Sequence, residues 1–171
     1  MKTDHLELVP HAPWHILALN KGPDLYEKSI GFRPAQGLRE FIVSPEVSPA
    51  WLAELYGATG PDPWVWGFAV VHSADRAAIG VASFKGPPTA DGLVEIAYGI
   101  VPEYQSKGFA TEAAQALVTY ALASNQVRVV RAHTSAEVNA SGRVLTKCGF
   151  TRLGEVIDPD DGQVWRWEKR A

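Results

Sequence analysis

The chain has 171 residues, of which 46% are hydrophobic and 20% charged, and its formal net charge is −3. This composition is that of a soluble globular protein, and we expect one domain spanning residues 1–171. The mild acidity and the lack of a Lys/Arg run argue against nucleic acid or a membrane surface as a partner. The single cysteine, the lack of an apolar N-terminal core and the absence of a run of about 18–20 apolar residues favour a cytoplasmic location.

The N-terminal part has weak patterns of short elements. A strand over Leu6–Val9 is expected to stop at Pro10, and two short helices between Trp14 and Ile30 are expected to break at Gly22-Pro23. We predict a strand over Leu38–Val43, a helical turn or two over Ala50–Tyr56, and a loop over residues 57–63.

From Trp64 onward the patterns are stronger. The β-rich runs Trp64–His72 and Ala78–Lys85 predict a hairpin, and Leu93–Val101 predicts a third strand that ends at Pro102. The clearest helix begins near Gly108, because apolar residues then recur at helical spacing. These residues are Ala110, Ala113, Ala114, Leu117, Val118, Ala121 and Leu122.

The last part completes the predicted fold. A strand over Val127–His133 follows the long helix, so it should run parallel to Leu93–Val101. Asn139–Cys148 reads as a helix, and Phe150–Val156 and Val164–Glu168 as a closing hairpin around residues 158–162. The predicted fold class is α/β (α+β): a mixed, mostly antiparallel sheet of about seven strands flanked by helices.

The segment 102–112 joins a strand end directly to a helix N-terminus. The first helical turn has unpaired backbone N–H groups and partial positive charge, so it can bind phosphate. Gly108 permits close backbone approach, Ala110 keeps the surface shallow, and Gln105, Ser106 and Lys107 can add hydrogen bonds or charge. An ordinary capped turn accounts for the same residues.

Two other phosphate-binding loops fit poorly. A P-loop has two Gly flanking four residues before Lys-Ser/Thr, whereas Lys107 precedes the only Gly of this loop. A Rossmann loop needs three spaced Gly and a downstream acid on a second strand, and these are missing.

Three motifs together carry a family resemblance. Gln105-x-x-Gly108-x-Ala110 resembles the pyrophosphate loop of the GNAT superfamily of N-acetyltransferases, and residues 93–102 resemble the strand that precedes this loop. Asn139-Ala-Ser141, followed by Val144-Leu145-x-Lys147-Cys-Gly149-Phe150, resembles the RimJ/RimL-like branch, which acts on ribosomal-protein N-termini. The resemblance spans about residues 78–168 and implies that the fourth and fifth strands splay apart to admit acetyl-CoA.

The resemblance also implies a set of cofactor-binding residues. Acetyl-CoA would be the co-substrate, its pantetheine arm pairing with backbone near Gly99, Ile100 and Val101. Its phosphates would lie on the loop residues Gln105, Ser106, Lys107, Gly108, Phe109, Ala110 and Thr111. Asn139 would bond the pantetheine amides, although a plain helix N-cap explains an Asn there equally well. No metal is expected.

Acetyl transfer to an amine needs a base, because an α-amine with a pKa of about 8 is partly charged at neutral pH. Glu95 is our candidate base, and a solvent-facing strand residue is the structural alternative. Ser141 is the candidate proton donor to the leaving thiolate. Tyr98 and Tyr104 are alternative donors, whereas His133 is expected to be structural or solvent-facing and Cys148 to lie in the core.

The acceptor cannot be named from these patterns. Two Trp pairs, Trp64/Trp66 and Trp165/Trp167, have the i, i+2 spacing of a strand face, which favours packing under a helix over an aromatic acceptor wall. The expected function is acetyl transfer from acetyl-CoA to a primary amine by a monomer or homodimer. A non-catalytic acyl-CoA-binding sensor or scaffold is the alternative.

Overall fold

The computed structural model describes residues 1–43, 48–159 and 161–171. Its sheet has the strand order β1-β3-β4-β5-β6-β8-β7, with the two-residue β2 pairing with β4. The strands are β1 (Leu6–Pro10), β2 (Arg33–Pro34), β3 (Phe68–His72), β4 (Ala77–Phe84), β5 (Leu93–Ile100), β6 (Val129–Ser135), β7 (Thr151–Asp158) and β8 (Gly162–Arg170).

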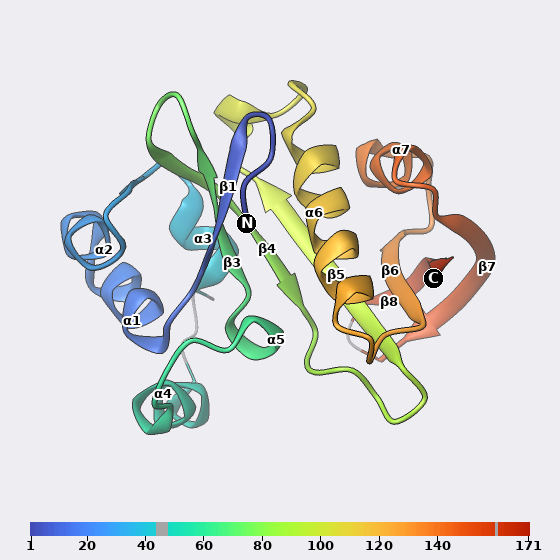
Figure 1. The fold of residues 1–171 in the computed structure, drawn as a ribbon, viewed down its shortest axis with the longest axis horizontal. Helices are drawn as coiled ribbons and strands as arrows, with labels where there is room; N and C mark the ends of the chain where they lie inside the picture. The colour runs from blue at the N-terminus through green and yellow to red at the C-terminus, as the bar shows by residue number, and fades with distance from the viewer. Residues whose placement is uncertain (44–47, 160) are drawn as a thin grey trace.

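Helices cover both faces of this sheet (Figure 1). They are α1 (Pro13–Lys21), α2 (Pro23–Ile30), α3 (Leu38–Ile42), α4 (Pro49–Gly57), α5 (Pro63–Trp66), α6 (Phe109–Ala123) and α7 (Ala140–Lys147), with a 3-10 turn η1 (Pro102–Tyr104). In Figure 1, α6 lies in front of the sheet and α3 behind it, while α1, α2 and α4 gather beside the N-terminal strands. Across the described ranges, no helix is long and apolar enough to span a membrane.

The strand pairing confirms the predicted mixed, mostly antiparallel sheet. Every pair along the strand order is antiparallel except β5–β6, which is parallel as the β5-α6-β6 crossover requires. Five of the seven residues of the predicted apolar stripe of α6 are buried, and Ala110 and Leu122 are half-buried. The stripe packs on the face of β5 that carries Val94 and Ile96. Burial of this stripe fixes the crossover and therefore the position of the segment that precedes α6.

The junction of β5 and β6 is short. Leu93–Glu95 pair with Val129–Arg131, and among the described residues the register goes no further. Beyond Glu95 and Arg131 the two strands diverge, because β5 continues along β4 while β6 continues along β8. The sheet therefore opens into a wedge between the ends of β5 and β6, as the splayed strands of the resemblance implied.

Two N-terminal predictions were wrong. Residues 38–42 form helix α3 instead of a strand, since Leu38 is fully buried and Phe41, one helical turn later, packs over Gly99 of β5. Trp64 and Trp66 lie on helix α5 and so do not share a strand face. Asp62 caps this helix by accepting the Trp64 N–H, and Pro63 occupies its first position. This Asp-Pro pair is a helix-start signal that the β-rich composition concealed.

The C-terminal elements match their predictions. The side chain of Asn139 caps α7 by accepting the Gly142 N–H, and Gly149 has the left-handed φ of 80° that ends the helix. Strands β7 and β8 form the closing hairpin, and residue 160 of its turn lies outside the described residues. Trp167 packs beneath α7, with its indole N–H donating to Thr134 Oγ1 at 3.0 Å.

A buried histidine makes stability depend on pH. His11 is 2% exposed and lies 2.8 Å from the Tyr26 hydroxyl; burial, aided by the nearby His15, lowers the pKa of His11 from 6.5 to about 3. Between pH 6.5 and about 3 the unfolded chain therefore binds a proton that the folded chain does not. The stability contributed by neutral His11 is full above pH 6.5 and falls as the pH drops, by about 1.4 kcal/mol per pH unit.

We expect urea unfolding of the wild type to show this loss between pH 7 and pH 5. A His11→Gln variant keeps a hydrogen-bonding side chain beside Tyr26 but cannot titrate, so its free energy of unfolding should depend less steeply on pH. Equal slopes for the two proteins over this range would show that folding does not lower the pKa of His11.

Candidate active site

The segment between β5 and α6 has the backbone of an anion-binding loop. Ser106 and Gly108 both have left-handed φ angles, of 63° and 91°, on either side of Lys107. Gly108 caps α6, and the first intrahelical bond runs from the Glu112 N–H to the Gly108 carbonyl at 3.1 Å. The N–H groups at residues 109–111 consequently have no acceptor within the helix and are available to an anion at its N-terminus.

A cavity of about 510 Å³ lies beside this loop. The end of β5, the loop, the first turn of α6 and one side of α7 form its walls. Of the sequence-predicted residues, it brings together Gly99, Ile100, Gln105, Ser106, Gly108, Ala110, Thr111 and Ser141. The cavity therefore lies between the end of β5 and α7, next to the gap between the diverging strands, and Glu95 is not among its lining residues.

Two cations that the sequence analysis missed also line this cavity. Arg143 and Lys147 lie four residues apart on α7 and face the same space as the loop. Lys107 stands nearby, with its ammonium 5.0 Å from the centre of the Tyr104 ring. The i, i+4 spacing of Arg143 and Lys147 was the available signal. Three positive charges and the free N–H groups make this end of the cavity suited to phosphate.

Several predicted cofactor residues have other contacts. Phe109 is buried and packs against His72, while the Val101 N–H donates to Ile79 of β4. Gln105 donates its side-chain amide to the Ile100 carbonyl at 2.8 Å, which ties the loop to the strand end. The side chain of Asn139 both caps α7 and donates to Ser135 Oγ at 2.7 Å, so the N-cap role is present in the structure.

Glu95 lies at the tip of the wedge, on the opposite face of β5 from α6. It is the last β5 residue in register with β6, and its carboxylate is 17% exposed. Its Oε1 accepts from Lys85 Nζ at 2.8 Å and lies 3.0 Å from His133 Nδ1. Burial disfavours the Lys85 ammonium, but the hydrogen bond and charge of Glu95 outweigh this, and the pKa of Lys85 is raised.

Hydroxyl groups occupy the cavity side of β5 and α7. Ser141 is exposed in the first turn of α7, and the Tyr98 hydroxyl donates to its carbonyl at 3.4 Å across the wedge. Burial raises the pKa of Tyr98, so its phenol remains protonated. Cys148 is 2% exposed, which confirms the predicted core position. Burial raises the pKa of its thiol, so it is not an activated nucleophile.

A second cavity of about 210 Å³ adjoins the first through Phe41, which lines both. The Phe41 ring lies against the backbone of Gly99, since a Cβ at that glycine would stand 2.8 Å from the ring. Aromatic and aliphatic side chains form most of the walls, and among the described residues none is Lys, Arg, Asp or Glu. Its other lining residues are His11, Ile16, Ile42, Trp51, Val65, Trp66, Phe68, Val81, Ser83 and Phe84.

Comparison with known proteins defines the class to which this fold and site belong. Residues 23–151 match the acetyltransferase (GNAT) domain, and the chain therefore belongs to the GNAT family. Among curated proteins it is 30% identical over 94 residues to the uncharacterized N-acetyltransferase YjdG of Bacillus subtilis (strain 168). That match covers 55% of this chain and 54% of the relative, so the chain spans about half the length of the curated relative that it matches.

Solved structures with the same fold are distant in sequence. An acetyltransferase of the GNAT family from Bacillus anthracis has a TM-score of 0.63 at 18% identity, covering 99% of this chain and 97% of that one. RimL, a ribosomal L7/L12 α-N-protein acetyltransferase in complex with coenzyme A, has a TM-score of 0.65 at 17% identity, covering 98% and 95%. A spermidine N-acetyltransferase SpeG chimera from Vibrio cholerae and hSSAT scores 0.67 at 18%, covering 98% and 96%.

Proposed function

We propose that this protein is an N-acetyltransferase that moves the acetyl group of acetyl-CoA to a primary amine by direct attack in a ternary complex. The observation that carries the proposal is the wedge between β5 and β6, with an anion-binding loop at its mouth and Glu95 at its tip. A phosphate site alone would fit many functions. A phosphate site at one end of a gap in the sheet, with a carboxylate at the other end of that gap, fits acyl transfer from a long cofactor.

The residues around the cavity fit acetyl-CoA. Its pyrophosphate would accept the free N–H groups at residues 109–111, and Arg143, Lys147 and Lys107 would offset its negative charge. The pantetheine arm would lie along the end of β5 at Gly99 and Ile100 and beside Ser141 of α7. Bound there, acetyl-CoA supplies an activated thioester to the tip of the wedge.

The chain's own residues would then handle two protons. The amine nitrogen forms a bond to the acetyl carbonyl carbon, and the carbon–sulfur bond breaks. Glu95 takes the proton that the amine loses, directly or through a water. The Ser141 hydroxyl gives a proton to the departing thiolate and regains one from the solvent to which it is exposed. A backbone N–H of β5 would stabilise the negative charge on the carbonyl oxygen.

The second cavity is our proposed place for the rest of the acceptor. Its apolar walls begin at Phe41, and burial keeps His11 neutral there. Such walls favour an amine attached to an apolar or aromatic group over a polycation or a polyanion. The motif resemblance to the RimJ/RimL-like branch makes a peptide α-amine with an apolar side chain the first acceptor to test.

The test is thiol release from acetyl-CoA in the presence of a panel of amines. The panel contains peptides with apolar and with charged N-terminal residues, arylalkylamines, a polyamine and an aminoglycoside. We expect turnover to be highest for the apolar peptides and the arylalkylamines. Tight binding of coenzyme A by calorimetry with no turnover for any amine would instead indicate the non-catalytic acyl-CoA-binding module.

A further inference from the structure

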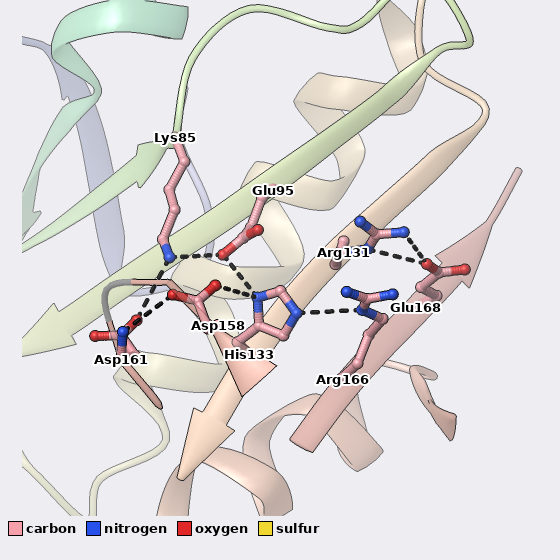
Figure 2. Close-up of polar contacts among 8 residues, drawn as sticks. All are labelled: Lys85, Glu95, Arg131, His133, Asp158, Asp161, Arg166 and Glu168. Atoms are coloured by element: carbon pink, nitrogen blue, oxygen red, sulfur yellow. Dashed lines mark hydrogen bonds and ion pairs between the residues drawn. The ribbon is translucent and has the colours of Figure 1, made fainter. Parts of the chain in front are cut away.

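A group of charged side chains surrounds His133 on the face of β5, β6 and β8 opposite α6 (Figure 2). The imidazole is 7% exposed and lies between Glu95 and Arg166. The charged groups that face it come from every neighbouring element: Lys85 after β4, Glu95 from β5, Arg131 from β6, Asp158 from β7, Asp161 from the turn, and Arg166 and Glu168 from β8.

Arg166 determines which nitrogen of His133 carries the proton. Its Nε lies 3.3 Å from His133 Nε2, and a guanidinium N–H can only donate. His133 Nε2 must therefore present its lone pair to Arg166. In the neutral ring the proton is then on Nδ1, which lies 3.0 Å from Glu95 Oε1 and donates to it.

This arrangement fixes one oxygen of Glu95 and leaves the other for chemistry. Both contacts to the carboxylate, from His133 Nδ1 and Lys85 Nζ, are made to Oε1, and among the described residues none is made to Oε2. Lys85 is 44% exposed and also reaches Asp161 at 3.6 Å, so it can move into solvent. His133 is held by Glu95 on one side and by Arg166 on the other, so its contact with Glu95 remains when Lys85 moves away.

We propose that His133 is a positioning residue for Glu95, held as the Nδ1–H tautomer by Arg166. The neutral N–H orients the carboxylate toward the wedge without adding a positive charge beside it, and Oε2 stays available for the amine proton. This inference rests on the proposed function only for the role of Glu95 as a base. The tautomer and the contact belong to the resting protein.

The first measurement therefore needs no activity. Nitrogen-15 NMR of the histidine rings in the whole protein should show His133 with its proton on Nδ1, and the signal of this proton should shift in a Glu95→Ala variant. An Arg166→Met variant should lose the single tautomer. Either of two results would overturn the proposal whether or not the protein is an enzyme. One is a proton on Nε2 of His133 in the wild type, and the other is an Nδ1 proton signal that does not shift in Glu95→Ala.

The second measurement compares two replacements of His133. Asn places an amide N–H close to the position of Nδ1, whereas Val removes the donor. We expect His133→Val to lower kcat by about 10- to 100-fold, the effect of one hydrogen bond to a charged group, and to move the acid side of the pH–rate profile to higher pH. His133→Asn should restore kcat to within a few-fold of the wild type.

Circular dichroism and the affinity for coenzyme A serve as controls for folding, and both should be the same in the two variants. Equal losses in His133→Val and His133→Asn, or no loss in either, would overturn the positioning role. Absence of turnover in the wild type would count against the proposed function instead, and the NMR signals would then decide the His133 contact by themselves.

Discussion

Replacing Glu95 with Gln is expected to lower kcat by about 100- to 10,000-fold, the range that a positioned general base contributes. The amide keeps the size of the carboxylate and can still accept from His133 Nδ1, but it cannot take a proton from the amine. Glu95 points to the face of β5 away from the loop, so coenzyme A affinity should be unchanged. Steady-state kinetics with the best acceptor of the panel, together with calorimetry, measure both quantities.

A matched replacement separates this effect from a general loss of charge. Glu155 is an exposed carboxylate on β7 whose contact is with Gln163, and Glu155→Gln should leave kcat unaltered. If Glu95→Gln retained kcat within about threefold of the wild type, a water or a backbone group would have to be the proton acceptor, and Glu95 would lose its assigned role.

Replacing Gly108 with Trp is expected to weaken coenzyme A binding by at least about 100-fold, or about 2.8 kcal/mol. Gly108 lines the cavity at the cap of α6, and a Cβ there would meet no atom within 4 Å. The indole would therefore occupy the space in front of the first-turn N–H groups instead of the protein core. The left-handed φ of 91° adds a folding cost of about 1–2 kcal/mol for any residue with a side chain.

Gly31 provides the control for this folding cost. It ends α2 with a φ of 84°, and a Cβ there would also meet no atom within 4 Å, but it lies outside the cavity. Gly31→Trp should lower the free energy of unfolding by a similar amount and leave calorimetric coenzyme A affinity unchanged. Similar coenzyme A affinities for the Gly108→Trp and wild-type proteins would show that the phosphate site does not lie at this loop.

The predicted fold was correct where local patterns are long. The seven apolar positions of α6 run from Ala110 to Leu122, about three and a half turns, and their periodicity favours a helix packed on the sheet. Helices α3 and α5 have five and four residues, too few to show a period, and their aromatic and β-branched residues favour strands. Tertiary contacts, such as Phe41 on Gly99, decide the outcome in such segments.

The loop of the candidate site could be predicted from the sequence, but the contacts around Glu95 could not. The loop residues follow one another in the chain, so a local motif identifies them. The contact of Glu95 with His133 depends on the register of β5 against β6, and the contact of His133 with Arg166 depends on the register of β6 against β8. No local pattern encodes either register, which is why His133 was expected to be structural or solvent-facing.

The short junction between β5 and β6 has a mechanical consequence. The sheet consists of two parts, β1–β5 and β6–β8, which in the described part of the chain are paired through three residues of each strand and bridged by α6. This junction has fewer paired residues than the other strand pairs along the sheet, so we expect bending to be easiest there, and Glu95 and Arg131 are the last pair before the gap. A small rotation of one part against the other would change the distance from Glu95 to α7 more than the distances within either part. A molecule that fills the gap would hold the two parts apart, so the rigidity of the proposed site would come in part from the bound cofactor.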